Sequence, residues 1–193
     1  MTRIMNGTKV FIAGSRSLSR LDNDVRRRID NIVDRGFTAI VGDANGVDKA
    51  VQRYLKSRNY SNVVVFCMEG GCRNNIGDWP TRTITAADPA RRDFAYYSTK
   101  DRAMAEEADY GLMLWDGRSR GTLTNIVHLL REGKPVVVYI ARDKSFHTLR
   151  RSHHLAEILD RFDPTALRRI DRELEAVAMG NSSSRKVDTA PLF

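Results

Sequence analysis

The segment 116–122 contains the residue types that bind a phosphate. It follows an apolar run at 110–115 and precedes a segment with helical apolar spacing at 123–130. A strand, a turn of small residues and a helix start together aim free backbone N–H groups at an anion. The small and polar residues of the segment are Asp116, Gly117, Arg118, Ser119, Arg120, Gly121 and Thr122. The sequence therefore predicts that they form the phosphate cradle of a nucleotide or phosphosugar pocket.

Two other loops of small residues also follow apolar runs, the first after 9–13 and the second after 37–41. Their members are Gly14, Ser15 and Arg16 in the first loop, and Gly42, Asp43, Ala44 and Gly46 in the second. Arg16 could clamp a phosphate, or it could form an ion pair with Asp43 or Asp116. We expect both loops to contribute walls to the same pocket.

Five apolar runs rich in β-branched residues predict the strands that must position these loops. They lie at 9–13, 37–41, 62–66, 109–115 and 135–140, and amphipathic segments at about 21–35, 47–55, 99–108 and 122–130 separate them. This alternation predicts an α/β fold, a Rossmann-like doubly wound parallel sheet of about five strands with helices on both faces. With the order 3-2-1-4-5, the direction of winding reverses between the first and fourth strands. Ligands bind at that reversal, so the three loops should converge there.

The chain divides into three predicted regions. Residues 1–141 form the nucleotide-binding domain, and their stretch 68–94 has no clear period, which is typical of a functional loop or an insertion. A C-terminal helical extension at 142–179 contains predicted helices at 147–160 and 164–178. Residues 180–193 read as a flexible tail. We expect the two terminal helices to pack on the core or to bury a homo-oligomer interface.

The three loops, together with a Lys100-Asp101 pair, resemble the SLOG superfamily over residues 8–141. The resemblance implies that the chain binds a nucleotide or a nucleotide-derived, phosphoribosyl ligand, in one reading as a sensor. Some relatives cleave N-glycosidic bonds, so the alternative is a hydrolase that releases a base from a nucleoside monophosphate. A third reading is DNA binding of the kind used in natural transformation. Lys100, at the position of the family's arginine, would contact the ligand.

Three carboxylates are the candidate catalytic residues: Asp48, Asp101 and Asp116. The spacing of Asp48 and Asp101 is also typical of residues that cap a helix. In the functional interpretation, each carboxylate holds a ribose hydroxyl or orients a water molecule. The phosphoribohydrolases carry two glutamates shortly after the threonine of the cradle, and this chain has Thr124 and Asn125 there. The loss of both glutamates argues against that mechanism and leaves catalysis open.

Composition bounds the remaining expectations. The net charge of +8 is spread along the chain, so we do not expect nucleic acid to be a partner. The two cysteines, Cys67 and Cys72, predict free thiols in a cytoplasmic protein. No apolar run reaches the length of a membrane span, so we expect no membrane partner. No resident metal site is predicted, and Mg²⁺ would enter only through ligand phosphates.

Overall fold

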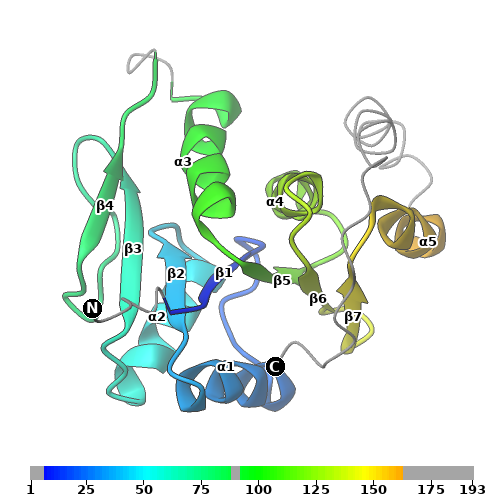
Figure 1. The fold of residues 1–193 in the computed structure, drawn as a ribbon, viewed down its shortest axis with the longest axis horizontal. Helices are drawn as coiled ribbons and strands as arrows, with labels where there is room; N and C mark the ends of the chain where they lie inside the picture. The colour runs from blue at the N-terminus through cyan, green and yellow to red at the C-terminus, as the bar shows by residue number, and fades with distance from the viewer. Residues whose placement is uncertain (1–6, 88–91, 163–193) are drawn as a thin grey trace, which may run out of the picture.

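A seven-stranded sheet forms the centre of the computed structural model, which describes residues 7–87 and 92–162 (Figure 1). Its order is β4-β3-β2-β1-β5-β6-β7, and every neighbouring pair is parallel except β6 and β7. The strands are β1 (Lys9–Gly14), β2 (Thr38–Gly42), β3 (Val63–Met68), β4 (Thr81–Ile84), β5 (Tyr110–Trp115), β6 (Val136–Ile140) and β7 (Ser145–Leu149). The five predicted strands are present in the predicted order, which confirms the doubly wound α/β class.

Helices cover both faces of this sheet. They are α1 (Asn23–Asp34), α2 (Val47–Ser57), α3 (Phe94–Glu107), α4 (Arg120–Arg131) and α5 (Ser152–Phe162). The first two lie on one face, and α3, α4 and α5 lie on the other (Figure 1). No helix in the described part of the chain is long and apolar enough to cross a membrane.

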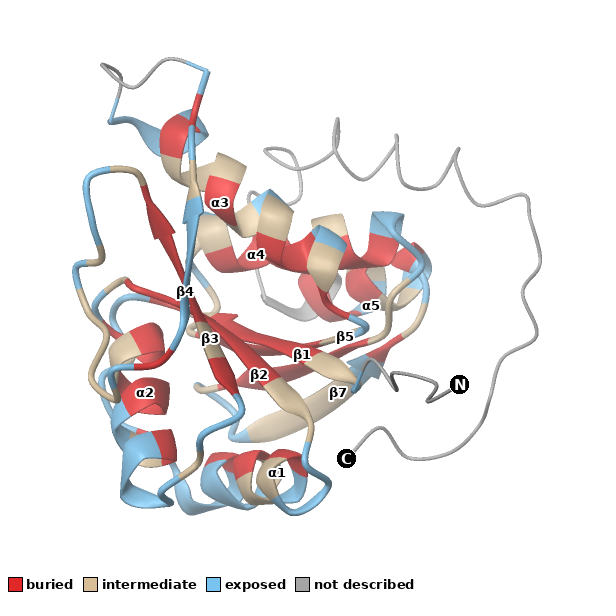
Figure 2. Ribbon diagram, turned by 60° about the vertical axis from the view of Figure 1, so that its left-hand side comes forward, coloured by how far each residue is buried: buried red, intermediate tan, exposed pale blue. Residues whose placement is uncertain are grey.

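Alternation along β1 explains how one strand supports both layers. Val10 and Ile12 pack into the cluster that contains α1 and α2, whereas Phe11 and Ala13 pack into the cluster that contains α3 and α4. All four side chains are buried, and buried positions run through the whole middle of the sheet (Figure 2). The rigid centre fixes the carboxyl ends of β1, β2 and β5, where the predicted loops begin.

The two edge strands were not predicted. Strand β4 lies within the stretch 68–94, and its side chains are mostly exposed, so it has no apolar run. Strand β7 pairs with β6 in the antiparallel sense and occupies the start of the segment predicted as a helix at 147–160. Helix α5 accordingly begins later, at Ser152. The helix predicted at 164–178 and the tail at 180–193 lie outside the described residues.

Candidate ligand site between α3 and α4

A cavity of about 520 Å³ lies over the carboxyl ends of β1 and β2, between α3 and α4. It is next to the boundary between β1 and β5, where the winding of the sheet reverses. Among the predicted site residues, those that line it are Gly14, Arg16, Gly42, Ala44, Asp48, Lys100, Asp101, Asp116, Ser119, Gly121 and Thr122. The residues that do not line it are Ser15, Asp43, Gly46, Gly117, Arg118 and Arg120. Its volume is in the range of small-molecule sites.

Hydroxyl groups gather where α4 begins. The Ser119 Oγ caps the helix by accepting the Thr122 N–H at 3.3 Å, and the Thr122 hydroxyl lies 3.0 Å from the same oxygen. The Ser15 Oγ lies 3.3 Å from the Thr122 Oγ1 and accepts the Asp116 N–H at 3.0 Å. The first and third loops are therefore joined through buried serine and threonine side chains.

The Asp116 carboxylate itself occupies part of the predicted phosphate cradle. It accepts the N–H groups of Arg118 at 2.9 Å and Ser119 at 2.8 Å, and the Ser17 hydroxyl at 2.6 Å. Burial would raise the pKa of Asp116, but these hydrogen bonds outweigh burial and lower it. Within the described residues, the N–H groups of Arg120 and Gly121 have no acceptor. The predicted cradle therefore has fewer N–H groups available to a ligand than expected, and the available ones belong to the first residues of α4.

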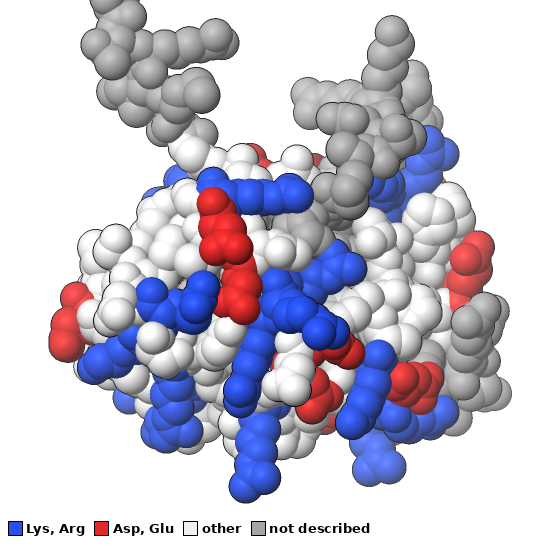
Figure 3. All heavy atoms as spheres, turned by 90° about the horizontal axis from the view of Figure 1, so that it is seen from below, with Lys and Arg blue, Asp and Glu red and all other residues white. Residues whose placement is uncertain are grey.

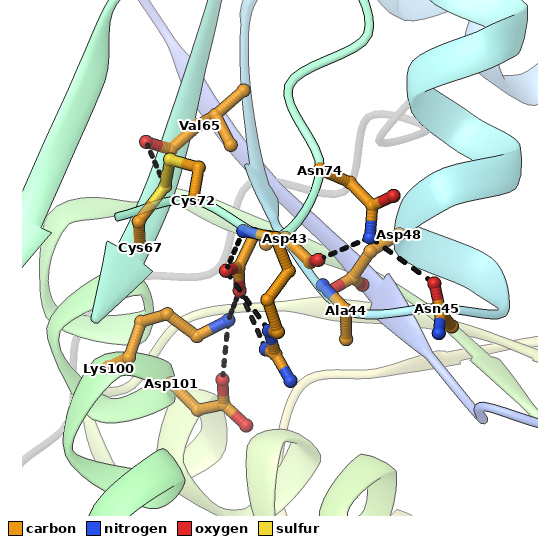
Figure 4. A network of polar contacts seen from close by, with 12 residues as sticks. Asp43, Ala44, Asn45, Asp48, Val65, Cys67, Cys72, Asn74, Lys100 and Asp101 are labelled. Atoms are coloured by element: carbon orange, nitrogen blue, oxygen red, sulfur yellow. Dashed lines mark hydrogen bonds and ion pairs between the residues drawn. A yellow bond between two sulfur atoms is a disulfide. The ribbon is translucent and has the colours of Figure 1, made fainter. Parts of the chain in front are cut away.

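A buried ion-pair network forms beside the cavity, at the end of β2 (Figure 4). Arg73 binds Asp43 with its backbone N–H at 3.0 Å, its Nε at 3.2 Å and its Nη2 at 2.7 Å. The Lys100 Nζ lies 3.1 Å from the same carboxylate and is 3% exposed. Burial would raise the pKa of Asp43, but the Arg73 hydrogen bonds and the Lys100 charge hold it at about 2. Asp43 is therefore ionised and holds Arg73 and Lys100 in place. Arg16 does not form the ion pair with Asp43 that the sequence allowed, and its guanidinium lies over the Tyr97 ring.

Asp48 lies deeper in the same network. Its Oδ2 accepts the Ala44 N–H at 3.1 Å. This contact is not the capping box that the spacing suited, because the N-cap of α2 is Gly46 and makes no side-chain capping bond. Burial raises the pKa of Asp48 to about 6, although the charge of Lys100 opposes the shift. Gly42 makes the close approach possible, because a Cβ there would lie 2.3 Å from the Asp48 Oδ2 and 2.9 Å from the Lys100 Nζ.

Asp101 is not a helix cap, contrary to one reading of its spacing. Helix α3 begins at Phe94, five residues before the predicted start at Thr99, because the Asp93 carboxylate accepts the Tyr96 N–H and caps it there. Asp101 consequently lies inside the helix and lines the cavity. Burial raises its pKa, while the Lys100 charge and a hydrogen bond from Asn125 oppose the shift.

A strap at 72–76 carries Arg73 to Asp43, and sequence reasoning missed it. The strap begins at a Cys67–Cys72 disulfide, so the prediction of two free thiols is wrong. The pairing depends on the turn between the two cysteines, which brings their Cα atoms to 5.0 Å, a distance that a disulfide can bridge. The spacing of the cysteines in the sequence does not predict that turn. Asn74 continues the strap by donating to the Asp43 backbone oxygen at 2.7 Å. The disulfide and these bonds hold Arg73 against the site.

Aromatic and arginine side chains surround the mouth of the cavity. Phe94 is 41% exposed, and the Arg120 guanidinium lies 4.4 Å from the centroid of its ring. Tyr97 has Arg73 at 4.9 Å and Arg16 at 5.7 Å from its ring centroid. Such pairs present flat faces with positive charge. Sequence reasoning missed Phe94, because it lies at the end of the stretch 68–94, which has no clear period.

No protein-family model and no curated protein sequence matches this chain. The fold is similar to that of DNA processing protein A from Helicobacter pylori. The solved structure of that protein describes its mode of binding single-stranded DNA. The TM-score is 0.55 with 14% sequence identity, and the match covers 89% of this chain and 80% of the other. At this identity the likeness shows a related fold.

This comparison overturns the expectation that nucleic acid is not a partner, because the protein with the related fold binds single-stranded DNA. The expectation rested on the scattered distribution of charge. On the face with α1 and α2, lysine and arginine side chains are indeed interspersed with acidic ones (Figure 3). Scattered charge is therefore a poor criterion for excluding nucleic acid, since stacking of bases on aromatic side chains also contributes to the binding of single strands.

Proposed function

We propose that the cavity between α3 and α4 binds a nucleotide, with its phosphate at the start of α4. The observation that carries the proposal is the polarity of the cavity. One end offers the free Gly121 N–H and the Thr122 hydroxyl, whereas the other end presents the carboxylates of Asp48 and Asp101. A phosphate is attracted to the first end by the helix dipole and its donors. The SLOG-like loops support the same class of ligand.

Calorimetric titration of nucleoside monophosphates and the matching nucleosides tests this proposal. We expect the phosphate to be required for tight binding, and Thr122→Val to weaken monophosphate binding about tenfold by removing one hydrogen bond to a charged group. Thr124→Val is the matched control, because Thr124 is buried on the same helix but does not line the cavity. Equal affinities for nucleosides and monophosphates, or no binding at all, would refute the proposal.

The same samples test the two remaining questions about the ligand. Chromatography after incubation detects free base, which is the product of the alternative N-glycoside hydrolysis. Repeating the titrations in EDTA and in Mg²⁺ shows whether a cation bridges the phosphate to the site. Binding that is unchanged by Mg²⁺ means that the protein donors alone hold the phosphate.

Single-stranded DNA is the second candidate ligand, favoured by the exposed Phe94 beneath Arg120 and by the related fold of a protein that binds such DNA. Stacking of a base on an aromatic ring contributes roughly 1–3 kcal/mol. Fluorescence anisotropy with a labelled oligothymidine should therefore show weaker binding for Arg120→Ala. Arg35→Ala is the matched control, because Arg35 lies over Phe37, at the opposite end of β2. Affinity that does not fall with added salt would contradict this candidate.

A further inference from the structure

The two ends of the strap at 72–76 are attached to the protein in different ways. Helix α2 holds the C-terminal end, because the Ile76 N–H donates to the Gln52 Oε1 at 2.9 Å and the Gln52 Nε2 donates to the Asn74 backbone oxygen at 3.1 Å. Gln52 is itself buried, and its Nε2 also lies 2.8 Å from the Gly42 backbone oxygen. The attachment of this end therefore does not involve the disulfide.

The N-terminal end of the strap depends on the Cys67–Cys72 disulfide (Figure 4). The chain between the cysteines passes through Gly70 and Gly71, which are exposed and have φ angles of 95° and 105°. A Cβ at Gly70 would meet only Arg92, at 3.9 Å, and a Cβ at Gly71 would meet nothing within 4 Å. Two exposed glycines have many accessible conformations and fix a chain poorly. The disulfide is therefore the firm connection between β3 and the start of the strap.

Arg73 follows this connection directly and also lines the cavity. Its backbone N–H and its guanidinium bind Asp43, and the guanidinium lies 4.9 Å from the centroid of the Tyr97 ring. The Arg73 side chain is 39% exposed, whereas that of Asp43 is 2% exposed. Opening the disulfide frees Arg73 on its N-terminal side, which removes a positive charge from the cavity wall and leaves Lys100 as the cation beside Asp43.

The chemistry of opening is a thiol–disulfide exchange with an external thiol. Cys72 is the sulfur that the thiol reaches, because Cys72 is partly exposed and Cys67 is 1% exposed. The external thiolate attacks the Cys72 Sγ, and the electron pair of the S–S bond passes to the Cys67 sulfur, which takes up a proton. A second external thiolate resolves the mixed disulfide, and Cys72 takes up the second proton. Two external thiols are thereby oxidised to one disulfide, and the protein disulfide is reduced by two electrons to two thiols.

We infer that the Cys67–Cys72 disulfide is a redox switch of the cavity, whose reduction by a thiol releases Arg73 from Asp43 and weakens the binding of an anionic ligand. The inference rests on the proposed nucleotide-binding function and adds to it a means of regulation. The response is local, because the bonds to Gln52 keep the C-terminal end of the strap on α2.

Amide hydrogen exchange, resolved by NMR on the full chain with and without dithiothreitol, tests the release of the strap without any ligand. The Arg73 N–H donates to Asp43 in the oxidised protein and should exchange at least about tenfold faster after reduction. The Ile76 N–H, which donates to Gln52, is the matched control in the same molecule and should keep its rate. An unchanged rate at Arg73, or an equal rise at Ile76, would overturn the inference.

Calorimetry with the nucleoside monophosphate that binds most tightly in the titrations above tests the effect on the site. The oxidised protein should bind it about threefold more tightly than the reduced protein, the value of one partly exposed charge. Arg73→Gln keeps the disulfide but loses the charge, so it should bind like the reduced wild type and should not respond to dithiothreitol. The double variant Cys67→Ser with Cys72→Ser should also bind like the reduced wild type in both conditions. Circular dichroism confirms the folding of each variant.

Each outcome separates the inference from the function on which it rests. Equal affinity of the oxidised and reduced wild type would overturn the inference while nucleotide binding stands, and would assign the disulfide a purely structural role. A loss of affinity that dithiothreitol also causes in Arg73→Gln would assign the effect to another part of the fold and would overturn it as well. Absence of binding by every monophosphate in both redox states refutes the proposed function and with it the effect on binding, whereas the exchange rates show separately whether reduction releases Arg73.

Discussion

Replacing Asp48 by asparagine should change the pH dependence of stability in a direction that the structure fixes. Asp48 is 7% exposed, and burial raises the pKa of its carboxyl from 3.8 to about 6. In the unfolded chain the carboxyl releases its proton near the ordinary value. As pH rises from about 4 to 6, the unfolded chain releases this proton more readily than the folded chain does. The free energy of unfolding therefore falls over this range, and the stabilising contribution of the protonated carboxyl is lost.

The size of this effect follows from the difference of about 2 pKa units. Each unit corresponds to about 1.4 kcal/mol, so ionisation of Asp48 lowers the free energy of unfolding by up to about 3 kcal/mol. The amide side chain in Asp48→Asn would not titrate, and its oxygen can still accept the Ala44 N–H. The free energy of unfolding of Asp48→Asn minus that of the wild type should therefore rise by up to about 3 kcal/mol between pH 4 and pH 7.

Urea unfolding at half-unit intervals between pH 4 and pH 7.5, followed by tryptophan fluorescence, measures this difference directly. Asp34→Asn is the matched control, because it makes the same substitution on an exposed carboxylate at the end of α1. A difference that is constant with pH, or that falls as pH rises, would refute the reasoning. It would mean that the Lys100 charge outweighs the burial of Asp48.

Three further substitutions test the packing around the site. Gly42→Ala places a Cβ 2.3 Å from the Asp48 carboxylate and should destabilise the protein by about 1–3 kcal/mol in urea unfolding, whereas Gly121→Ala, with nothing within 4 Å, should be neutral or stabilising. Cys72→Ser removes the disulfide that closes a short loop and should cost about 2 kcal/mol. A reductant should lower the melting temperature of the wild type but not that of Cys72→Ser; an equal fall in both would contradict this assignment.

The central strands and their loops were predictable because they rest on local patterns. Buried β-branched runs identify β1, β2, β3, β5 and β6, and the glycine-containing loops at their ends predict a candidate site at the reversal of winding, where the structure has a cavity. The edge strands escaped because their side chains are partly solvated and lack an apolar run. In a sheet the neighbours of an edge strand, and not its own composition, determine whether it forms.

The missed site residues depend on contacts between distant parts of the chain. Arg73 lies in a stretch without periodicity, and only the fold brings it to Asp43, 30 residues away. Asn125 was noted only as a departure from a glutamate pair, and only the fold shows that it lines the cavity together with Asp101 of α3. The phosphate cradle was predicted from its residue types. The sequence could not show that the Asp116 carboxylate accepts hydrogen bonds from two N–H groups of the cradle, those of Arg118 and Ser119.

The carboxylate of Asp116 has a consequence for how quickly ligands exchange. By bonding to Arg118, Ser119 and Ser17, it holds the loop before α4 in shape through groups of the protein itself. If a phosphate binds there, as we propose, it meets a preformed site and little further ordering is needed on arrival, which favours fast association. It also binds beside a fixed negative charge, which favours fast departure. We expect occupancy to follow the surrounding ligand concentration closely, with short residence times, as in a site that reports a concentration and does not store its ligand.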